Sequence, residues 1–325
     1  MEIKKIAIIT SGGDSPGMNA ALRSVVRTAL FHKIECVGFN RGYQGLIEND
    51  YTELKMRSVS NILEVGGTIL KTARSLVFHK PEIREEAFKN LKALNIDALV
   101  VIGGNGSITG GHVLSEQFDF PCIGIPASID NDIYGTDNSI GFQSALQTIV
   151  DSIDKIRDTA RSHNRLFFVE VMGRDNGNLA LHSSVSTGAC FVIVPEKEFA
   201  INDLVNRLKM GKSLDKSSSI VVVAEGNNHG PSYKIAEDLY KVYNEYECKV
   251  TILGHLQRGG SPVVMDRILA SRMGLMAVEA LMSNHHRHMV GIINNESVLI
   301  PTGEVVSKRK IINEDLYKLN KIISR

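Results

Sequence analysis

The chain has 325 residues, 37 of them basic and 36 acidic, with a formal net charge of +1. That length exceeds what one small core needs, and the balanced charge excludes a bulk attraction to nucleic acid or a membrane, so any anion site must be built locally. The four cysteines stand far apart without a C-x-x-C pair and the apolar runs are too short to span a bilayer, so we expect reduced thiols in a cytoplasmic protein rather than a disulfide framework or a zinc site.

The first predicted unit is a strand, a glycine-rich turn and a helix. Residues 4–10 form an apolar run typical of a buried strand, and they leave no room for a signal peptide before them. Residues 11–19 are rich in glycine, and residues 20–31 have helical spacing. Free amides at such a loop and at the following helix start favour an anion, so this unit predicts a phosphate site.

The same order returns twice in the first half of the chain. Residues 96–102 form an apolar strand followed by the loop 103–107 and a short predicted helix, and residues 121–125 lead into a loop that carries Asp130 and Asp132. Strands alternating with helices predict a parallel, doubly wound α/β sheet whose ligands bind beyond the carboxyl ends of the strands. We therefore expect the three loops to share one rim.

Asp130 and Asp132 are two residues apart, so in extended backbone their side chains face the same way. One carboxylate could accept a proton from a substrate hydroxyl while the other anchors a cation. Taken alone, the stretch would equally suit a solvated Asx-rich turn. Its place after a buried strand, among other phosphate-type loops, favours the catalytic interpretation.

Beyond residue 140 the alternation restarts. Residues 141–161 have the spacing of a long amphipathic helix, and residues 166–172, 190–194 and 220–224 predict strands of a second α/β lobe. Residues 251–254 and 290–293 are further predicted strands that we assign to the first sheet, and residues 311–323 have helical spacing.

Some motifs point to other functions and are set aside. Residues 13–17 fit the G-x-S-x-G pattern of hydrolases, but Pro16 has no amide to give to an oxyanion hole. Residues 211–213 resemble the end of a Walker loop that lacks its first glycine and a preceding strand. Residues 285–288 hold histidines without a flanking carboxylate or cysteine, so we interpret them as a solvated helix end rather than a metal site.

Several loops combine glycine with arginine. Arg74 ends the loop 66–74, Arg174 follows a predicted strand, and the loop 254–262 holds His255 and Arg258. Arginine suits planar, bidentate capture of phosphate. Each arginine alone could be a structural salt-bridge partner. However, surface loops without a function would not be expected to combine glycine and polar residues after so many strands.

Together these stretches resemble the ATP-dependent 6-phosphofructokinases of the bacterial type. The resemblance runs from residue 4 to about residue 293 and rests on residues 10–20, 66–74, 128–132, 169–174 and 254–262, with Asp266 and Arg267. It implies an α/β fold of two doubly wound lobes with mainly parallel sheets. Residues 1–140 with about 252–300 are expected to form a nucleotide-binding lobe, and residues 141–251 with 301–325 a sugar-phosphate-binding lobe.

The resemblance implies transfer of the ATP γ-phosphoryl group to the 1-hydroxyl of fructose 6-phosphate in glycolysis. Asp130 matches the catalytic base, Arg74 and Arg174 match cations that balance charge on the transferring group, and Ser128 keeps a hydroxyl where relatives have threonine. Matches to the ATP site are Gly12, Tyr43, Arg74, Asn105, Gly106 and Ser107. Matches to the sugar-phosphate site are Ser128, Asp130, Arg165, Met172, Gly173, Arg174, Glu225, Lys249, His255 and Arg258.

The resemblance also implies a homotetramer and a metal. In the family a neighbouring subunit completes the sugar-phosphate site through the positions of Arg165 and Lys249, so shared active sites are expected. Mg²⁺ is expected near Asn105 and Asp132, with ATP as co-substrate. Pyrophosphate-using relatives carry Asp and Lys where this chain has Gly106 and Ala127, so these small residues favour ATP over pyrophosphate as the donor.

Three departures from the family pattern keep alternatives open. Asn105 replaces an aspartate that helps hold Mg²⁺, and an amide oxygen lacks the charge that Mg²⁺ prefers. Lys249 replaces an arginine, so a bidentate grip becomes a point charge. Cys190 replaces a glutamate of the effector site, although Arg23, Arg27 and Arg157 match that site. The chain is then either a slower phosphofructokinase that needs more Mg²⁺ and has lost or changed its effector, or a non-catalytic sensor of sugar phosphate or nucleotide. The presence of Asp130, Arg74 and Arg174 favours the enzyme.

Overall fold

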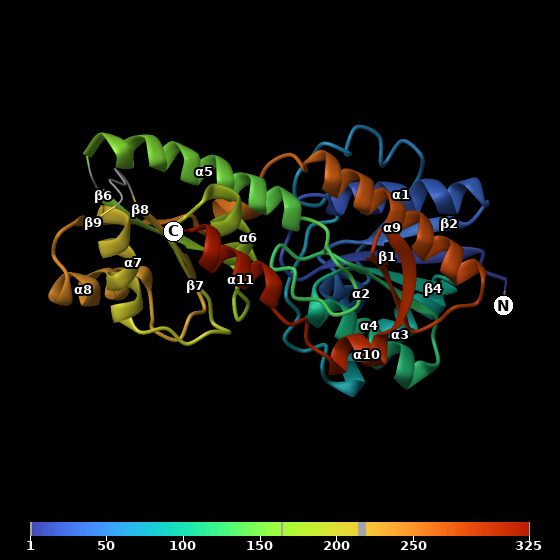
Figure 1. The fold of residues 1–325 in the computed structure, drawn as a ribbon. Helices are drawn as coiled ribbons and strands as arrows, with labels where there is room; N and C mark the ends of the chain where they lie inside the picture. Colours follow the sequence, from blue (N-terminus) through green and yellow to red (C-terminus); the bar gives the residue numbers. More distant parts are fainter. Residues whose placement is uncertain (1, 164, 214–218, 325) are drawn as a thin grey trace. The chain divides into compact units, whose positions relative to one another are not determined.

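The computed structural model describes residues 2–163, 165–213 and 219–324, which fall into two compact units (Figure 1). The first unit takes in the chain up to Ser128, then Asp132–Ser144 and Arg258–Lys310. The second takes in Ile129–Asn131, Ala145–Gln257 and the chain from Ile311 onward. Residues 141–144 and 301–310, which we expected in the second lobe, therefore group with the first, and residues 129–131 and 252–257 group with the second.

The first unit is built on a seven-stranded sheet in the order β11-β10-β5-β4-β1-β2-β3. Neighbours from β10 to β2 pair in parallel, while β3 and β11 pair antiparallel at the two edges. Its strands are β1 (Lys5–Ser11), β2 (Glu35–Phe39), β3 (Tyr51–Leu54), β4 (Ala98–Gly103), β5 (Cys122–Pro126), β10 (His288–Ile293) and β11 (Glu296–Pro301). Its helices are α1 (Met18–Phe31), α2 (Tyr43–Glu48), α3 (Pro81–Ala93), α4 (Asn105–Phe118), α9 (Val264–Met282) and α10 (Thr302–Ser307).

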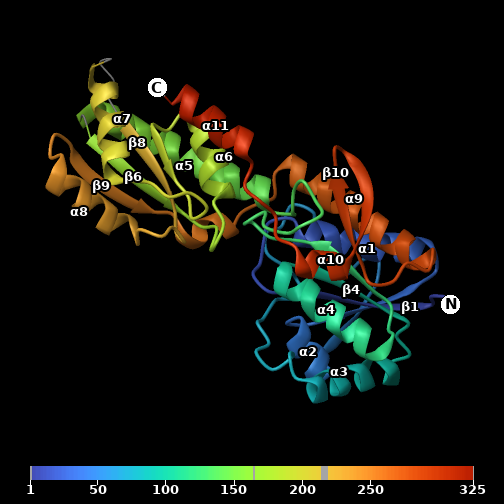
Figure 2. The ribbon, with the colours of Figure 1, turned by 60° about the horizontal axis from the view of Figure 1, so that its bottom comes forward.

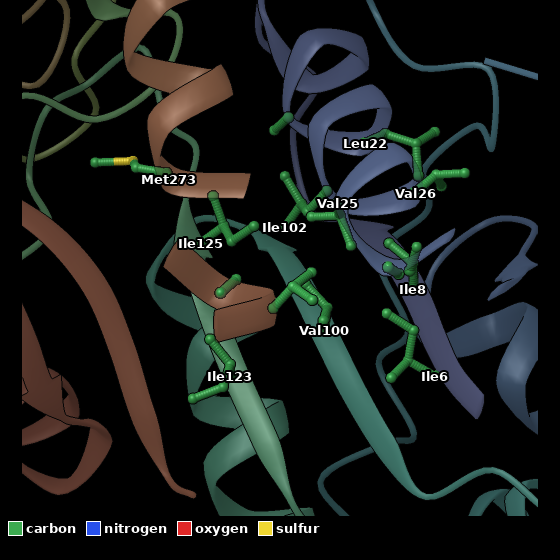
Figure 3. Close-up of a cluster of buried hydrophobic side chains, with 14 of the residues drawn as sticks. Ile6, Ile8, Leu22, Val25, Val26, Val100, Ile102, Ile123, Ile125 and Met273 are labelled. Carbon is green, nitrogen blue, oxygen red and sulfur yellow. The ribbon is translucent and has the colours of Figure 1, made fainter. Parts of the chain in front are cut away.

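Strand alternation sends apolar side chains to both faces of this sheet. Ile6 and Ile8 belong to a core shared with α1 and α9, which Figure 3 shows between the strands and those two helices. Ala7 and Ile9 belong to a second core with α2, α3 and α4, on the opposite side of the sheet (Figure 2). The continuous apolar runs of β1, β4 and β5 follow from this double burial, as in other helix-covered parallel sheets.

The second unit contains a four-stranded, all-parallel sheet in the order β7-β8-β6-β9. Its strands are β6 (Arg165–Val171), β7 (Phe191–Ile193), β8 (Ser219–Ala224) and β9 (Glu247–Ile252). Its helices are α6 (Asn178–Thr187), α7 (Ile201–Ser213), α8 (Ser232–Val242), α11 (Glu314–Ile323) and most of α5 (Phe142–His163). Buried side chains of β6 and β8 form a core with α7 and α8, while α6 packs against β7 and β8 and in turn carries α11.

The predicted α/β class with two doubly wound, mainly parallel lobes is confirmed, but one strand was wrongly placed. The run predicted as a strand of the first sheet at residues 251–254 is the end of β9, which pairs with β6 in the second sheet, and Gly254–Arg258 form a 3-10 turn. β9 lies at an exposed sheet edge and begins with charged residues, so its apolar signal appears only at its end. The helix predicted as short after residue 107 is the full-length α4.

Two further features of the described residues are the state of the cysteines and the apolarity of the helices. All four cysteines are free thiols, and Cys36, Cys122 and Cys190 are buried. Burial raises the pKa of Cys36 and of Cys122 to about 12, so both are inert thiols at neutral pH. Across residues 2–163, 165–213 and 219–324, the search for a helix of the length and apolarity needed to cross a bilayer finds none.

Candidate active site

Three loops leave the carboxyl ends of neighbouring strands in the first unit. Gly103 at the end of β4 pairs with Ser11 of β1 on one side and with Pro126 of β5 on the other. The loops that begin after residues 11, 103 and 126 therefore start from one edge of the sheet, as the alternation of strands and helices predicted. We refer to this edge as the rim.

Tyr43 supports the loop between β4 and α4. Its hydroxyl donates to the main-chain oxygen of Ser107 at 2.5 Å, and its ring stacks on Phe78 with centroids 4.1 Å apart. Because Tyr43 is buried, it holds this loop in place rather than presenting its ring to solvent. Gly106 lies on the open side of the loop, where an added Cβ would have no neighbour within 4 Å. The amides at the start of α4 and the space at Gly106 suit a phosphate chain.

Gly12 brings the first loop close to the second. Its φ of +90° is a backbone conformation that favours glycine, and a Cβ there would lie 3.1 Å from Oγ of Ser107. Glycine at this position therefore allows both the turn and the close approach of the two phosphate-type loops.

Polar side chains near the first loop hold the segment that carries Arg74. The Thr10 hydroxyl donates to the main-chain oxygen of residue 71 at 2.8 Å, and the Thr72 hydroxyl donates to that of Gly12 at 2.7 Å. Asn19 donates to the main chain at residue 65 at 3.0 Å and accepts from the amide of residue 69 at 2.8 Å. The segment is thereby fixed against the first glycine-rich loop, and Arg74 is exposed at its end.

Asp132 accepts hydrogen bonds on both of its carboxylate oxygens. Asn105, the first residue of α4, donates from Nδ2 to Oδ2 at 2.8 Å, and Ser128 donates from Oγ to Oδ1 at 3.3 Å. A dication needs oxygen lone pairs, and an amide N–H directed at the carboxylate offers none. Among the described residues, no group of three or more His, Cys, Asp or Glu side chains is placed to hold a metal ion. As arranged here, Asn105 and Asp132 do not fit a resident Mg²⁺.

A half-buried lysine that the sequence did not single out interacts electrostatically with this carboxylate. Lys310 Nζ donates to the main-chain oxygens of Thr136 and Asp137 at 2.8 and 2.7 Å. Burial lowers the pKa of Lys310 to about 8, and the negative charges of Asp137 and Asp132 partly oppose that shift. Lys310 therefore places a positive charge within electrostatic reach of Asp132.

The guanidinium of Arg258 lies over the first glycine-rich loop. Its Nη1 donates to the main-chain oxygen of Asp14 at 3.0 Å, and a Cβ added to Gly13 would lie only 2.7 Å from the same nitrogen. Arg258 thus belongs to the rim of the first unit. His255, from the same sequence motif, is exposed and belongs to the second unit.

In the second unit, Asn178 fixes the short segment that carries Asp130. Nδ2 of Asn178 donates to the main-chain oxygen of Asn131 at 3.0 Å, and the Asn178 amide is held by Oδ1 of Asn176 at 2.8 Å. Asn131 has a φ of 53°, a left-handed conformation that asparagine tolerates. The Asp130 residue is only 8% exposed, so its carboxylate is held in a largely shielded position.

Arg174 follows β6 in a tight turn with unusual backbone angles. Gly173 has a φ of 143° and Arg174 a φ of 52°. The Arg174 amide donates to the Glu225 carboxylate at 2.9 Å, and a Cβ at Gly226 would lie 1.6 Å from the Arg174 main-chain oxygen, so glycine is required there. The turn leaves Arg174 exposed. Asp130 and Arg174 belong to the second unit, and Arg74 belongs to the first.

The turn after β9 is tied to the end of β6. Oε1 of Gln257 accepts from the Met172 amide at 3.1 Å, and Gln257 is fully buried. This contact fixes the turn that carries His255 relative to Met172 and Gly173, two of the other residues matched to the sugar-phosphate site.

Arg165 and Lys249 share one carboxylate. Arg165 on β6 lies opposite Glu247 on the parallel strand β9. Arg165 Nε and Lys249 Nζ each lie 2.6 Å from a different carboxylate oxygen of Glu247. Hydrogen bonds from Lys249 and then from Arg165 hold the pKa of Glu247 below its usual range. The structure therefore brings these two expected phosphate ligands together.

The expected effector residues come from both units. Arg23 and Arg27 lie one turn apart on α1 in the first unit, and Arg157 lies on α5 in the second. Arg157 donates to the main-chain oxygen of Thr187, and burial lowers the Arg157 pKa. Cys190 lines a cavity of about 450 Å³ together with residues of α7 and α11. No acidic side chain takes the place of the family's glutamate at position 190 itself.

Comparison with known proteins identifies the family to which this chain belongs. The family model described as Phosphofructokinase matches residues 5–281, which is most of the chain. The chain belongs to the phosphofructokinase family. It is 50% identical to ATP-dependent 6-phosphofructokinase 2 of Bacteroides thetaiotaomicron, over 99% of both chains. It is 49% identical to the ATP-dependent 6-phosphofructokinase of Cytophaga hutchinsonii, over 98% of this chain and 97% of that one.

A solved structure supports the same assignment. The phosphofructokinase of Saccharomyces cerevisiae superimposes with a TM-score of 0.88 at 37% identity and covers 94% of this chain. This chain spans 45% of the yeast chain.

The roles of some residues that shape the site were not predicted. Asp266 accepts from the amides of Gly141 and Ser144 at 2.9 and 2.7 Å and from the Ser144 hydroxyl at 2.6 Å, which anchors the start of α5. Asp266 stood in a matching stretch, so its role had a signal in the sequence. Asn178 and Lys310 had none, because the main-chain oxygens to which their side chains donate lie far away along the chain.

Proposed function

We propose that this protein transfers the γ-phosphoryl group of ATP to the 1-hydroxyl of fructose 6-phosphate, giving fructose 1,6-bisphosphate in glycolysis. The observation that carries the proposal is an identity of 49–50% with proteins named ATP-dependent 6-phosphofructokinase over nearly the whole of both chains. The rim of the first unit and the arginine loops supply the residue types that phosphoryl transfer needs, because this reaction depends mainly on positioning and on electrostatic stabilisation.

ATP is the phosphoryl donor in this proposal and binds at the rim. Gly12, Gly106 and Ser107 line its phosphate chain, Arg74 contacts the transferring end, and Tyr43 supports the loop. The open space at Gly106 and the small side chain of Ala127 favour ATP over pyrophosphate. Mg²⁺ enters as part of the nucleotide substrate, where it neutralises charge on the phosphates.

Fructose 6-phosphate is the acceptor. Arg165, Lys249, His255 and Arg258 bind its phosphate, while Met172, Gly173 and Glu225 contact the sugar. The adjacency of Arg165 and Lys249 across β6 and β9 supports their joint role as a phosphate clamp. Phosphate ligation by one bidentate guanidinium and one ammonium is strong but less directional than ligation by two arginines.

Asp130 is the general base in this proposal. It takes the proton of the 1-hydroxyl as that oxygen attacks the γ-phosphorus, and the bond from phosphorus to the β,γ-bridging oxygen breaks. Arg74 and Arg174 balance the charge on the transferring group, and the Ser128 hydroxyl helps to position it. The hydrogen bond from Asn178 to the main chain beside Asp130 supports this role, because a base must be held within reach of its proton.

We propose a homotetramer in which Arg165 and Lys249 reach the site of a neighbouring subunit, which the family resemblance supports. A tetramer in light scattering, together with loss of turnover in monomers, is the expected result. The effector site formed by Arg23, Arg27, Arg157 and Cys190 is expected to respond weakly to ADP or phosphoenolpyruvate, since Cys190 brings no negative charge.

The deciding experiment is a coupled assay with fructose 6-phosphate, run with ATP or pyrophosphate over rising Mg²⁺. Turnover with ATP is expected. A change of Asp130 to Asn should lower kcat by about 10²–10⁴-fold, whereas the exposed α5 residue Asp154 changed to Asn should leave it unaltered. Binding of fructose 6-phosphate without turnover at any Mg²⁺ concentration would show that the protein is a non-catalytic sensor instead. The hydrogen bond between Asn105 and Asp132, two residues expected near Mg²⁺, is the observation that favours this alternative.

A further inference from the structure

Two side chains from neighbouring strand ends meet at the rim and bond to one another. Asn105 opens α4 directly after β4, and Asp132 lies in the loop that follows β5. Because β4 and β5 pair in parallel up to Gly103 and Pro126, both residues start from the same edge. Nδ2 of Asn105 lies 2.8 Å from Oδ2 of Asp132 and 3.5 Å from its main-chain oxygen. The amide nitrogen of Asn105 thus faces Asp132 in both contacts.

The remaining carboxylate oxygen of Asp132 is also engaged. Oδ1 accepts from the Ser128 hydroxyl at 3.3 Å, and the ammonium of Lys310 is close enough to interact electrostatically with the carboxylate. An N–H donor, an O–H donor and a nearby cation therefore surround one negative charge. A carboxylate stabilised in this way needs no metal to balance it.

A carboxylate at position 105 would reverse this situation. An aspartate in the place of Asn105 would put two carboxylates within hydrogen-bond distance of each other, and such a pair cannot hold both negative charges without a shared proton or a bound cation. An oxygen-rich, doubly negative pair is also what a hard divalent cation binds. The exchange of one oxygen for an NH₂ group removes the repulsion and the demand for a cation together.

We propose that Asn105 keeps the rim free of a resident divalent ion: its amide supplies to Asp132 the stabilisation that a metal would supply to a pair of carboxylates. The nucleotide-free protein then has no divalent-cation site at Asp132. The metal enters only with the nucleotide, a part of the inference that rests on the proposed function. The absence of any metal-type cluster of His, Cys, Asp or Glu among the described residues agrees with this.

The inference is tested by titrating the nucleotide-free full-length protein with Mn²⁺ and following the loss of the free-ion EPR signal. The wild type should show no saturable site tighter than on the order of 1 mM, the weak end of protein sites for hard divalent cations. The Asp132→Asn variant should give the same titration as the wild type. The Asn105→Asp variant should gain one site at least tenfold tighter, which Mg²⁺ displaces and which the double variant Asn105→Asp/Asp132→Asn lacks.

Each alternative result overturns the inference. A wild-type site that Asp132→Asn abolishes would show that the pair already holds a metal, and this comparison stands even if Asn105→Asp does not fold. A folded Asn105→Asp variant without a new site would show that the amide is not what excludes the ion. The titrations contain no nucleotide, so an inactive wild type with no Mn²⁺ site would refute the proposed activity and leave this inference standing.

Discussion

Arg258 and Asp14 are joined by a hydrogen bond of 3.0 Å from the guanidinium to the main-chain oxygen, with Gly13 directly beneath the guanidinium. The family resemblance matched Arg258 to the sugar-phosphate site, and Asp14 lies in the glycine-rich turn 11–19, which we predicted to bind phosphate and which holds Gly12, a match to the ATP site. One arginine therefore connects the two halves of the proposed reaction within a single unit, and glycine at position 13 leaves room for it.

The substitution Gly13→Ala should displace Arg258. The new Cβ would lie 2.7 Å from Nη1, so the flexible end of the arginine must move while the backbone keeps its conformation. We expect the KM for fructose 6-phosphate to rise by about 3–10-fold, the equivalent of one weakened charged hydrogen bond, with little change in melting temperature. Steady-state kinetics with each substrate varied in turn would measure this.

A double-mutant cycle supplies the control for Gly13→Ala. In an Arg258→Ala background the same substitution should have no further effect on the KM for the sugar phosphate. A persistent effect there would mean that the methyl group acts on the nucleotide instead. Gly106→Ala, at the open position, should leave the KM for fructose 6-phosphate unaltered.

Glu247 pairs with both cations expected to bind the sugar phosphate and offsets part of their positive charge. Changing Glu247 to Gln keeps the shape of the side chain but removes its charge, so Arg165 and Lys249 should attract phosphate more strongly. The KM for fructose 6-phosphate should fall by about 2–5-fold, in keeping with the small energies of exposed ion pairs, and the gain should shrink as salt is added. Kinetics at low and high ionic strength would show both effects.

Glu245 offers a matched control for Glu247. It precedes the same strand, its side chain is 49% exposed against 53% for Glu247, and it pairs with Lys212 instead. The change of Glu245 to Gln should leave the KM unaltered. An equal fall in both variants would trace the effect to net charge and refute the role of Glu247.

Lys310 should make the stability of this protein depend on pH in the alkaline range. Its folded-state pKa of about 8 lies below the ordinary value of 10.5, so the folded protein loses this proton first as the pH rises. Between these two values the unfolded chain binds more protons, and stability therefore rises with pH. Below pH 8 both states are protonated, and the cost of burying the charge is fully present. The gain is up to about 3 kcal/mol.

The variant Lys310→Met should lack that gain. Urea unfolding of both proteins at about pH 7.5 and about pH 10 would give the unfolding free energy of the wild type minus that of the variant at each pH. The contributions of the other titrating groups cancel in this difference. The difference should shift in favour of the wild type at the higher pH. Parallel pH profiles for the two proteins would mean that the lysine titrates normally in the folded state.

Much of the rim could be predicted from the sequence because its signals are local. The strands β1, β4 and β5 are continuous apolar runs, each closed by a polar loop, and burial on both sides of the sheet makes such runs recognisable. The start of β9 escaped prediction because an exposed edge strand alternates charged and apolar residues. Its pairing with β6 could not be predicted either, since parallel pairing joins strands that lie far apart in the chain.

The details of the site depend on contacts that no local pattern contains. That Asn105 departs from the family pattern was visible, but the direction of its amide depends on Asp132, 27 residues away. Lys310 bonds to a carbonyl 173 residues away, and nothing in its neighbourhood marks it. Residue types and spacing thus predicted which side chains are candidates for the site, while their hydrogen-bond partners required the fold.

Asn178 should act as a positioning residue for Asp130. Its amide holds the main chain at Asn131, the residue after the proposed base, through a bond of 3.0 Å, and Asn178 itself is buried. In Asn178→Ala the segment loses this anchor, and a misplacement of about 1 Å can cost about 10²-fold in rate. We expect kcat to fall by about 10–100-fold while the KM values for both substrates change little.

If Asn178 were only structural, Asn178→Ala would lower the melting temperature and leave kcat per folded molecule at the wild-type value. In an Asp130→Asn background, where the base is already absent, Asn178→Ala should lower kcat much less, and an equally large second loss would contradict its action through Asp130.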